Sequence, residues 1–201
     1  MKSLVDRFFS KNQSSTVCLI GEVNTGKSTL ANRISTDFAA QKMSETSEVP
    51  HETRTINKME HIDFKIGKNK LDLTLVDTPG IATSVDYKEF IQHGMTEQEA
   101  YNRAKEATSG IIASINFLKQ VDVALVLMDA TKPPFDQVSL TILGTLEMHK
   151  TKTIICANKT DLEGANTDII KSSFPHVSVV PISALKGHGM NELYNEIISI
   201  A

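Results

Sequence analysis

Residues 17–28 decide the fold, and they read Val-Cys-Leu-Ile-Gly-Glu-Val-Asn-Thr-Gly-Lys-Ser. The four leading apolar residues predict a short buried strand, and the rest matches the phosphate-binding pattern Gly-x-x-x-x-Gly-Lys-Ser. Gly21 and Gly26 let the backbone turn tightly, so that the amides of residues 24–28 point at a phosphate group at the start of a helix. Lys27 adds a positive charge to that site. The alternative interpretation is a glycine-rich turn with an exposed lysine.

Strands and helices alternate along the rest of the chain. A helix is predicted from Lys27 to about Arg33. Apolar runs predict later strands in four segments: 71–76, 121–128, 153–157 and 177–182. Because most of these runs are continuous, they are typical of strands that are buried on both faces of a parallel sheet. Segment 56–66 is predicted to be the antiparallel strand, since Gly67-Lys68-Asn69 joins it to the next strand in a hairpin.

Two apolar stripes predict the longer helices. Thr96 and Glu99 form a capping box at the start of the first one. Its stripe recurs every three or four residues: Ala100, Ala104, Ala107, Ile111, Ile115 and Leu118. Residues 193–200 repeat the pattern in the last helix. This alternation predicts a three-layer α/β/α domain around a mostly parallel six-stranded sheet, and ligands of such domains bind beyond the carboxyl ends of the strands.

The composition of the 201-residue chain excludes several classes of protein. A net charge of -3 and a pI near 6.1 argue against direct binding of nucleic acid and against attraction to an anionic membrane. Cys18 and Cys156 lie in apolar runs and are predicted to be buried thiols. No signal peptide and no membrane-spanning run is recognisable. We therefore expect a cytoplasmic protein with a lead-in at 1–14 and one domain at 15–201.

Three more polar strings follow predicted strands. They are Asp77-Thr78-Pro79-Gly80, Asn158-Lys159-Thr160-Asp161 and Ser183-Ala184-Leu185-Lys186. Asp161 can accept two hydrogen bonds from guanine, a pair of donors that adenine lacks. We expect the Lys159 stem to lie over the base and the Ala184 amide to reach its O6 atom. Taken singly, the strings also fit a turn, a polar loop and a helix N-cap.

Together with residues 21–34, these strings resemble the G domain of P-loop NTPases that act on GTP. The sequence Gly-Glu-Val-Asn-Thr-Gly-Lys-Ser-Thr-Leu-Ala-Asn-Arg-Ile and the string Asp-Thr-Pro-Gly are similar to the Era/Der-like branch of the translation-factor-related class. The resemblance covers the chain from about residue 15 to its end. It implies that the following residues bind the nucleotide: Asn24, Thr25, Gly26, Lys27, Ser28, Thr29, Asn158, Lys159, Asp161, Ser183, Ala184 and Leu185.

The resemblance also implies a Mg²⁺ ion held by Ser28, Asp77 and a threonine of switch I. Switch I is expected at about 37–57, and switch II with the following helix at about 77–119. Glu52-Thr53-Arg54 resembles the Thr-Thr-Arg of the family, so we choose Thr53 over Thr55. The alternative is that both threonines merely enter the next strand.

Ile81 occupies the position at which a glutamine orients the attacking water in Ras-like enzymes. The resemblance implies that catalysis comes from elsewhere, with Lys27, Thr53 and Gly80 as the catalytic residues and slow intrinsic turnover. It also implies that Asn24 helps bind a K⁺ ion that neutralises developing charge. The alternative for Asn24 is a tolerant loop residue.

The sequence therefore predicts a Mg²⁺-dependent molecular switch that binds GTP and GDP and hydrolyses GTP to GDP and phosphate. A GTP-dependent interaction module with negligible hydrolysis of its own is the main alternative, and a P-loop ATPase or nucleotide kinase is the other. The expected partner is an unidentified protein or ribonucleoprotein. A nucleotide-dependent dimer is also left open, whereas direct binding to nucleic acid or membrane is not expected.

Overall fold

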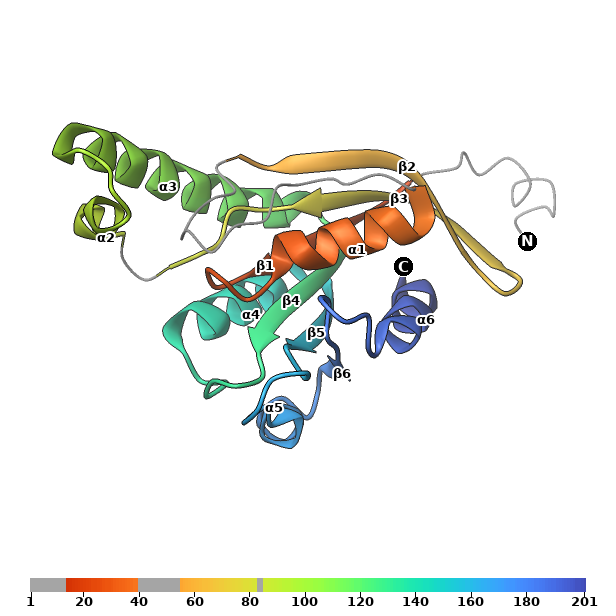
Figure 1. Ribbon diagram of the computed structural model, residues 1–201. Helices are drawn as coiled ribbons and strands as arrows, with labels where there is room; N and C mark the ends of the chain where they lie inside the picture. The colour runs from red at the N-terminus through yellow and green to blue at the C-terminus, as the bar shows by residue number, and fades with distance from the viewer. Residues whose placement is uncertain (1–13, 40–54, 83–84) are drawn as a thin grey trace.

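The computed structural model describes residues 14–39, 55–82 and 85–201, and within these ranges six strands form one sheet with helices on both faces (Figure 1). The strands are β1 Ser15–Gly21, β2 Asn57–Ile66, β3 Asn69–Asp77, β4 Val123–Asp129, β5 Lys152–Asn158 and β6 Ser178–Pro181. The helices are α1 Lys27–Ala39, α2 Tyr87–Gln92, α3 Glu97–Phe117, η2 Leu118–Gln120, α4 Gln137–His149, α5 Thr167–Ser173 and α6 Met190–Ile200.

The strand order is β2-β3-β1-β4-β5-β6, and every neighbouring pair except β2 and β3 is parallel. The pair β2–β3 is the predicted hairpin, and a register irregularity between Met59 and Ile62 coincides with a positive φ of 58° at His61. The mostly parallel six-stranded sheet is therefore confirmed.

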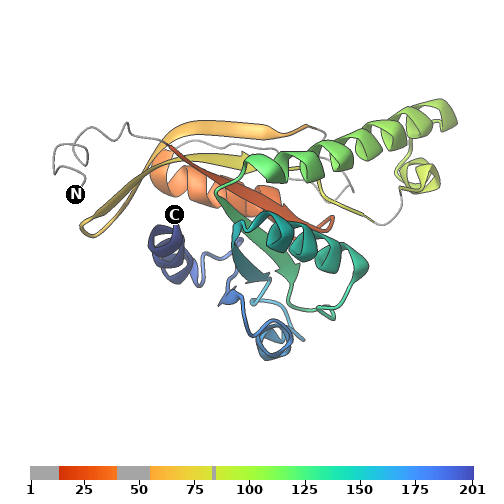
Figure 2. The same cartoon turned by 180° about the vertical axis from the view of Figure 1, so that it is seen from behind.

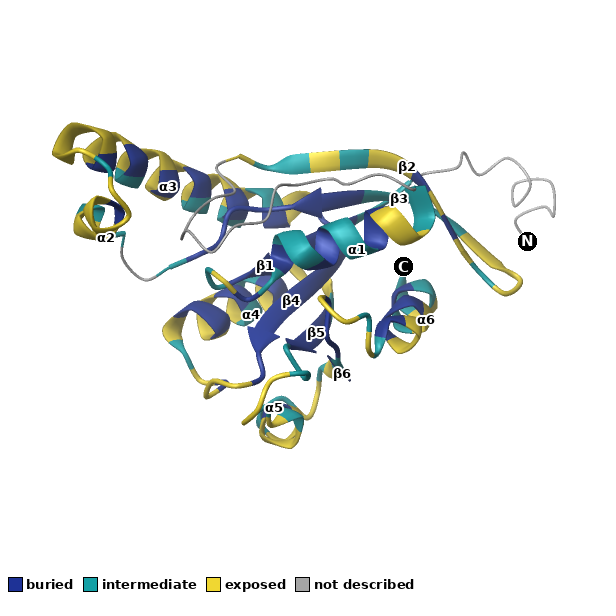
Figure 3. Cartoon of the chain, viewed as in Figure 1, coloured by how far each residue is buried: buried dark blue, intermediate teal, exposed yellow. Residues whose placement is uncertain are grey.

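Alternate residues of β1 supply two separate cores, one on each face of the sheet. Val17 and Leu19 pack with α1 and α6, whereas Cys18 and Ile20 pack with the face that carries α3, α4 and α5. Figure 2 shows the second face from behind, and Figure 3 shows that the central strands are buried along most of their length. This burial on both faces explains the continuous apolar runs of the sequence.

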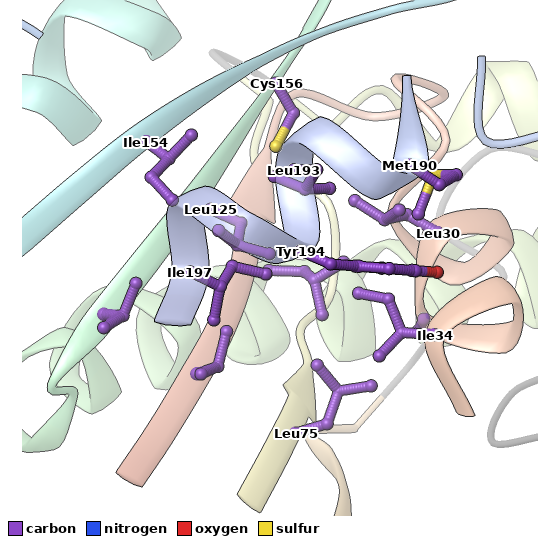
Figure 4. Packing of buried hydrophobic residues seen from close by; sticks show 14 of the residues in the cluster. Leu30, Ile34, Leu75, Leu125, Ile154, Cys156, Met190, Leu193, Tyr194 and Ile197 are labelled. Carbon is purple, nitrogen blue, oxygen red and sulfur yellow. The ribbon is translucent and has the colours of Figure 1, made fainter. Parts of the chain in front are cut away.

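Tyr194 of α6 ties the last helix to the first. Its ring lies edge-on to Phe38 and Phe64, with centroid distances of 5.0 and 5.4 Å, and its hydroxyl donates to Asp37 Oδ2 at 2.6 Å. Figure 4 shows this ring among apolar side chains of α1 and α6, including Ile34. These contacts extend α1 beyond the predicted end near Arg33, and residues 37–39, which were assigned to switch I, form its last turn.

Helix α3 begins with the predicted capping box: Thr96 Oγ1 accepts from the Glu99 amide, and Glu99 Oε2 accepts from the Thr96 amide at 2.9 Å. The buried face contains most of the predicted stripe and three further residues. Ala100, Ala107 and Leu118 are buried as expected, and Ile111 and Ile115 pack partly buried against the core. Arg103, Gly110 and Ser114 are buried as well, although the stripe did not include them. The reason is tertiary, because α2 packs against the first half of α3 and the Phe90 ring lies 5.7 Å from the Arg103 guanidinium.

Ser114 lies where α3 meets the sheet, and its hydroxyl donates to the Gly110 and Pro79 carbonyls. Small residues at this point let the helix approach the end of β3 closely. The N-terminal half of α3, together with α2, extends away from the sheet. It lies at the end of the molecule opposite the turn between β2 and β3 (Figures 1 and 2). In the part of the chain that the structure describes, no helix is long and apolar enough to cross a membrane.

Candidate nucleotide-binding site

The predicted phosphate loop lies between the end of β1 and the start of α1, as the motif requires. Gly21 passes so close to β4 that a Cβ there would collide with the Leu127 carbonyl oxygen. Gly26 has a φ of 97°, and a Cβ on it would collide with the Asn158 side-chain amide. Asn24 also has a left-handed backbone, with a φ of 62°, which asparagine adopts more readily than most residues. The loop shape thus explains both glycines of the motif.

Lys27 is buried at the base of the loop, with only 6% of its surface exposed. Its Nζ donates to the Glu22 carbonyl oxygen at 2.7 Å. Burial lowers the pKa of Lys27 to about 8, and this effect outweighs the opposing attraction of the Asp77 and Glu22 carboxylates. A phosphate group would supply the negative charge that this desolvated ammonium favours.

The string Asp77 to Gly80 joins β3 directly to the phosphate loop. Thr78 Oγ1 donates to the Leu19 carbonyl at 2.8 Å, and a Cβ on Gly80 would come within 2.9 Å of Val23. Ile81 continues this contact, because its amide donates to the Gly21 carbonyl and its carbonyl accepts from the Val23 amide. The Ile81 side chain is buried in the core and is therefore not a group that could orient water.

Asn158 joins three of the predicted motifs. Its Nδ2 donates to the Thr25 carbonyl of the phosphate loop at 2.8 Å, and its Oδ1 accepts from the Ala184 amide at 3.0 Å. This buried side chain holds the loops after β1, β5 and β6 in one arrangement. The Ala184 amide already donates to Asn158. The predicted contact with guanine O6 therefore requires this one N–H to donate to both acceptors.

Asp161 lines the pocket that lies between these loops. A hydrogen bond from Ser183 lowers the pKa of its carboxyl, and nearby Lys186 and His188 act in the same direction. Ser183 Oγ also accepts from the Lys186 amide at 3.0 Å, which tightens the loop after β6. Asp161 is therefore presented as an ionised acceptor, as recognition of guanine requires.

A pocket of about 400 Å³ lies between the phosphate loop with the start of α1 and the loops after β5 and β6. Its lining residues are Asn24, Gly26, Thr29, Asn158, Lys159, Asp161, Leu162 and Leu185. Seven of them belong to the set expected from the sequence, and Leu162 was missed because an apolar residue within a loop carries no motif. The volume lies within the usual range for small-molecule sites, roughly 300–1,000 Å³.

A second residue that the sequence analysis missed is Asp129, at the end of β4. Its Oδ2 accepts a hydrogen bond from Lys159 Nζ at 2.7 Å. A polar residue that ends an apolar strand was the available signal, because Asp77 and Asn158 were recognised in the same way.

Ser28 and Asp77 supply a hydroxyl and a buried carboxylate, the oxygen donors that Mg²⁺ prefers. Asp77 is close enough to Lys27 for its charge to act on the lysine pKa, which places it at the phosphate side of the site. Thr53 and its neighbour Glu52 lie outside the described residues, whereas Thr55 lies two residues before the start of β2. The two residues therefore fit the predicted Mg²⁺ site, and the choice of Thr53 stays a prediction.

The comparison with protein families decides which class this geometry belongs to. A family described as 50S ribosome-binding GTPase matches residues 16–159. The chain belongs to this GTPase family. GTPase Era of Geotalea daltonii is 30% identical over 184 residues, and GTPase Era of Rickettsia akari is 32% identical over 181 residues. Each alignment covers 88% of this chain and 52% of the relative, so the chain spans about half the length of these curated relatives.

Solved structures of this GTPase fold superpose on nearly the whole chain. Aquifex aeolicus Era bound to GDP and AlF4⁻ has a TM-score of 0.71 at 24% identity, covering 94% of this chain and 57% of that one. The G domain of the T. maritima FeoB iron transporter has a TM-score of 0.55 at 22% identity, covering 94% and 99%. The predicted Era-like G-domain fold is confirmed.

Proposed function

We propose that this chain binds GTP and GDP and hydrolyses GTP to GDP and phosphate, with its switch segments coupling the bound nucleotide to a partner. The observation that carries this proposal is the position of the Asn158 side chain, which holds the phosphate loop against the loops of the guanine motifs. One pocket is thus lined both by residues of the phosphate loop and by Asp161, the carboxylate proposed to read the base.

Each residue has a defined part in binding. Lys27 and the amides of the phosphate loop hold the phosphate groups, since a helix N-terminus favours negative charge. Ser28 and Asp77 would hold Mg²⁺, which supplies positive charge to the phosphates when bound. Asp161 accepts the two guanine donors, and its lowered pKa keeps it ionised at neutral pH.

The base preference is tested by exchanging Asp161 for asparagine and measuring the affinity for fluorescent N-methylanthraniloyl (mant) GDP. Loss of hydrogen bonds to a charged acceptor costs about 1.5–3 kcal/mol, so GDP affinity should fall at least about tenfold. The new amide can donate to the 2-oxo group of xanthine, so xanthosine diphosphate should gain affinity. Unchanged GDP affinity, or ATP competing as well as GTP for the wild-type site, would contradict guanine recognition and favour an ATPase or kinase.

Hydrolysis is proposed to be slow because Ile81 is buried where Ras-like enzymes carry a water-orienting glutamine. Intrinsic rates of unassisted GTPases lie at about 10⁻⁴–10⁻² s⁻¹. The same observation favours one second candidate, an interaction module whose own hydrolysis is negligible. Single-turnover phosphate release separates the two, since the module alone would release no phosphate above the uncatalysed background.

We further propose that K⁺ stimulates hydrolysis through Asn24, which lines the pocket. Turnover should then be faster in KCl than in NaCl of equal concentration, and the difference should vanish in Asn24→Ala. Equal wild-type rates in the two salts would rule out this role for K⁺.

The partner is proposed to be a protein or a ribonucleoprotein. One structural neighbour is Era in complex with MgGDPNP and a segment of 16S ribosomal RNA. For this chain the net charge of -3 favours contact with a protein component over direct RNA binding. Pull-downs with the protein loaded with GDP or with a GTP analogue test this, and enrichment of bare RNA by the purified chain would contradict it.

A further inference from the structure

The ion pair between Asp129 and Lys159 links the end of β4 to the guanine motif. Lys159 lines the nucleotide pocket, whereas Asp129 lies outside that lining, behind it in a neighbouring cavity. The lysine stem therefore runs along the pocket and its ammonium ends on a carboxylate whose side chain is 6% exposed. In this arrangement Lys159 lines the pocket while its charge is paired with Asp129.

The carboxylate that receives Lys159 is itself fixed. Asp129 Oδ1 accepts from both the amide and the hydroxyl of Thr131, at 3.0 and 2.7 Å, which leaves Oδ2 directed at Lys159. Burial raises the pKa of Asp129, but hydrogen bonds from Lys159 and Thr131 outweigh it and the pKa is lowered overall. Asp129 thus stays ionised over the physiological range and can act as a permanent anchor.

The backbones of the two loops are held together as well. Asp129 is in register with Asn158, and the Ala130 amide donates to the Asn158 carbonyl at 2.9 Å. Lys159, the next residue, has a φ of 67°, a conformation that a residue with a long side chain seldom adopts. This left-handed residue turns the backbone away from β5, and the ion pair with Asp129 fixes the orientation of the Lys159 side chain.

We propose that Asp129 is a positioning residue for guanine-nucleotide binding, which holds the Lys159 stem in its base-covering orientation before the nucleotide arrives. A free lysine side chain has many rotamers, and ordering it at the moment of binding would cost affinity. Asp129 removes that cost in advance. The inference rests on the proposed binding of GTP and GDP at this site.

The test is a double-mutant cycle on mant-GDP affinity with Asp129→Asn and Lys159→Met. Asparagine keeps the acceptor for Thr131 and loses the ion pair, so Asp129→Asn should weaken GDP binding about three- to tenfold. Methionine keeps an apolar stem without the charge, so in the Lys159→Met background Asp129→Asn should change affinity less than twofold. An equal loss in both backgrounds would show that Asp129 acts through the general stability of the loop, and would overturn the proposal.

Two controls keep the outcomes distinct. Wild-type protein that fails to bind mant-GDP overturns the proposed function together with this inference, whereas tight wild-type binding with an unaffected Asp129→Asn overturns the inference alone. Thr131→Val is the matched variant, since it removes one hydrogen bond to Asp129 and leaves the ion pair, and it should lower GDP affinity by less than Asp129→Asn does.

A measurement on the wild-type protein covers the case in which Asp129→Asn does not fold. The ¹⁵N relaxation of the Lys159 ammonium in the nucleotide-free protein should show restricted motion relative to the exposed ammonium of Lys68. Equal mobility of the two groups would contradict positioning before the nucleotide binds.

Discussion

We expect Lys27 to couple nucleotide binding to pH. Burial lowers the pKa of its ammonium to about 8 in the nucleotide-free protein, and bound phosphate groups would raise it again. Between pH 8 and the raised pKa, binding takes up a proton, so affinity must fall as the pH rises.

We therefore expect the affinity for mant-GDP to be nearly constant from pH 7 to 8 and to fall above pH 8, by at most about tenfold per unit. Lys27→Met should bind more weakly and lose this dependence, because it has no proton to take up. A wild-type affinity that rises between pH 8 and 9, or a fall that persists in Lys27→Met, would contradict the assignment to Lys27.

Gly26 is required by two constraints, a φ of 97° and the proximity of the Asn158 amide. Gly26→Ala should destabilise the fold by about 1–3 kcal/mol, as expected for a side chain forced into a sparsely populated conformation, and should also weaken GDP binding. Gly144→Ala is the matched control, since a Cβ there meets nothing within 4 Å in the middle of α4. That variant should be stabilised by about 0.5–1 kcal/mol. Urea unfolding measures both, and equal stability of the two variants would refute the argument.

Residues whose position depends on the geometry of one local loop could be predicted from the sequence. Residues whose position depends on how two strands pair in the sheet could not. The spacing of Gly21, Gly26 and Lys27 follows from the shape of one loop, so the string alone indicated the geometry of that loop. Asp129 depends on β4 lying beside β5 in a register that pairs it with Asn158, which no local pattern encodes. Thr53 lies outside the described residues, so its predicted role is untested.

At the scale of the element, the start of α3 is determined by neighbouring residues in the sequence, whereas its buried face depends on packing against other elements. The capping box was predicted because it needs only Thr96 and Glu99. The burial of Arg103 could not be predicted, because it depends on α2 packing over the helix. Likewise, the last turn of α1 depends on contacts of Phe38 with distant aromatic rings.

Thr96→Ala should lower the free energy of unfolding by about 1 kcal/mol, since it removes the side chain that accepts from the Glu99 amide. Thr108→Ala in the middle of α3 is the control: its exposed hydroxyl donates only to the Ala104 carbonyl of its own helix, so the change should be within about 0.5 kcal/mol. Urea midpoints measure both. GDP affinity should stay unchanged in each variant, and equal stability losses would contradict the role of the cap.

At the scale of the molecule, the sheet is what brings the site together. The loops after β1, β3, β5 and β6 all leave the same edge, because these strands are parallel. The motifs after β1, β5 and β6, which are separated by up to about 160 residues in the sequence, thereby meet around one pocket, and their order along the chain was sufficient to predict this. The fold could be predicted for the same reason: strands buried on both faces leave a strong apolar signal.

The central claim is that this pocket binds GTP and directs its hydrolysis. It is tested most directly by phosphate release in a single turnover, with enzyme in excess over GTP in the presence of Mg²⁺. We predict slow release of one phosphate per GTP, at about 10⁻⁴–10⁻² s⁻¹, that is abolished by EDTA and by Lys27→Met and is absent with ATP. Release from ATP as fast as from GTP, or release that is unaffected by Lys27→Met, would contradict the account.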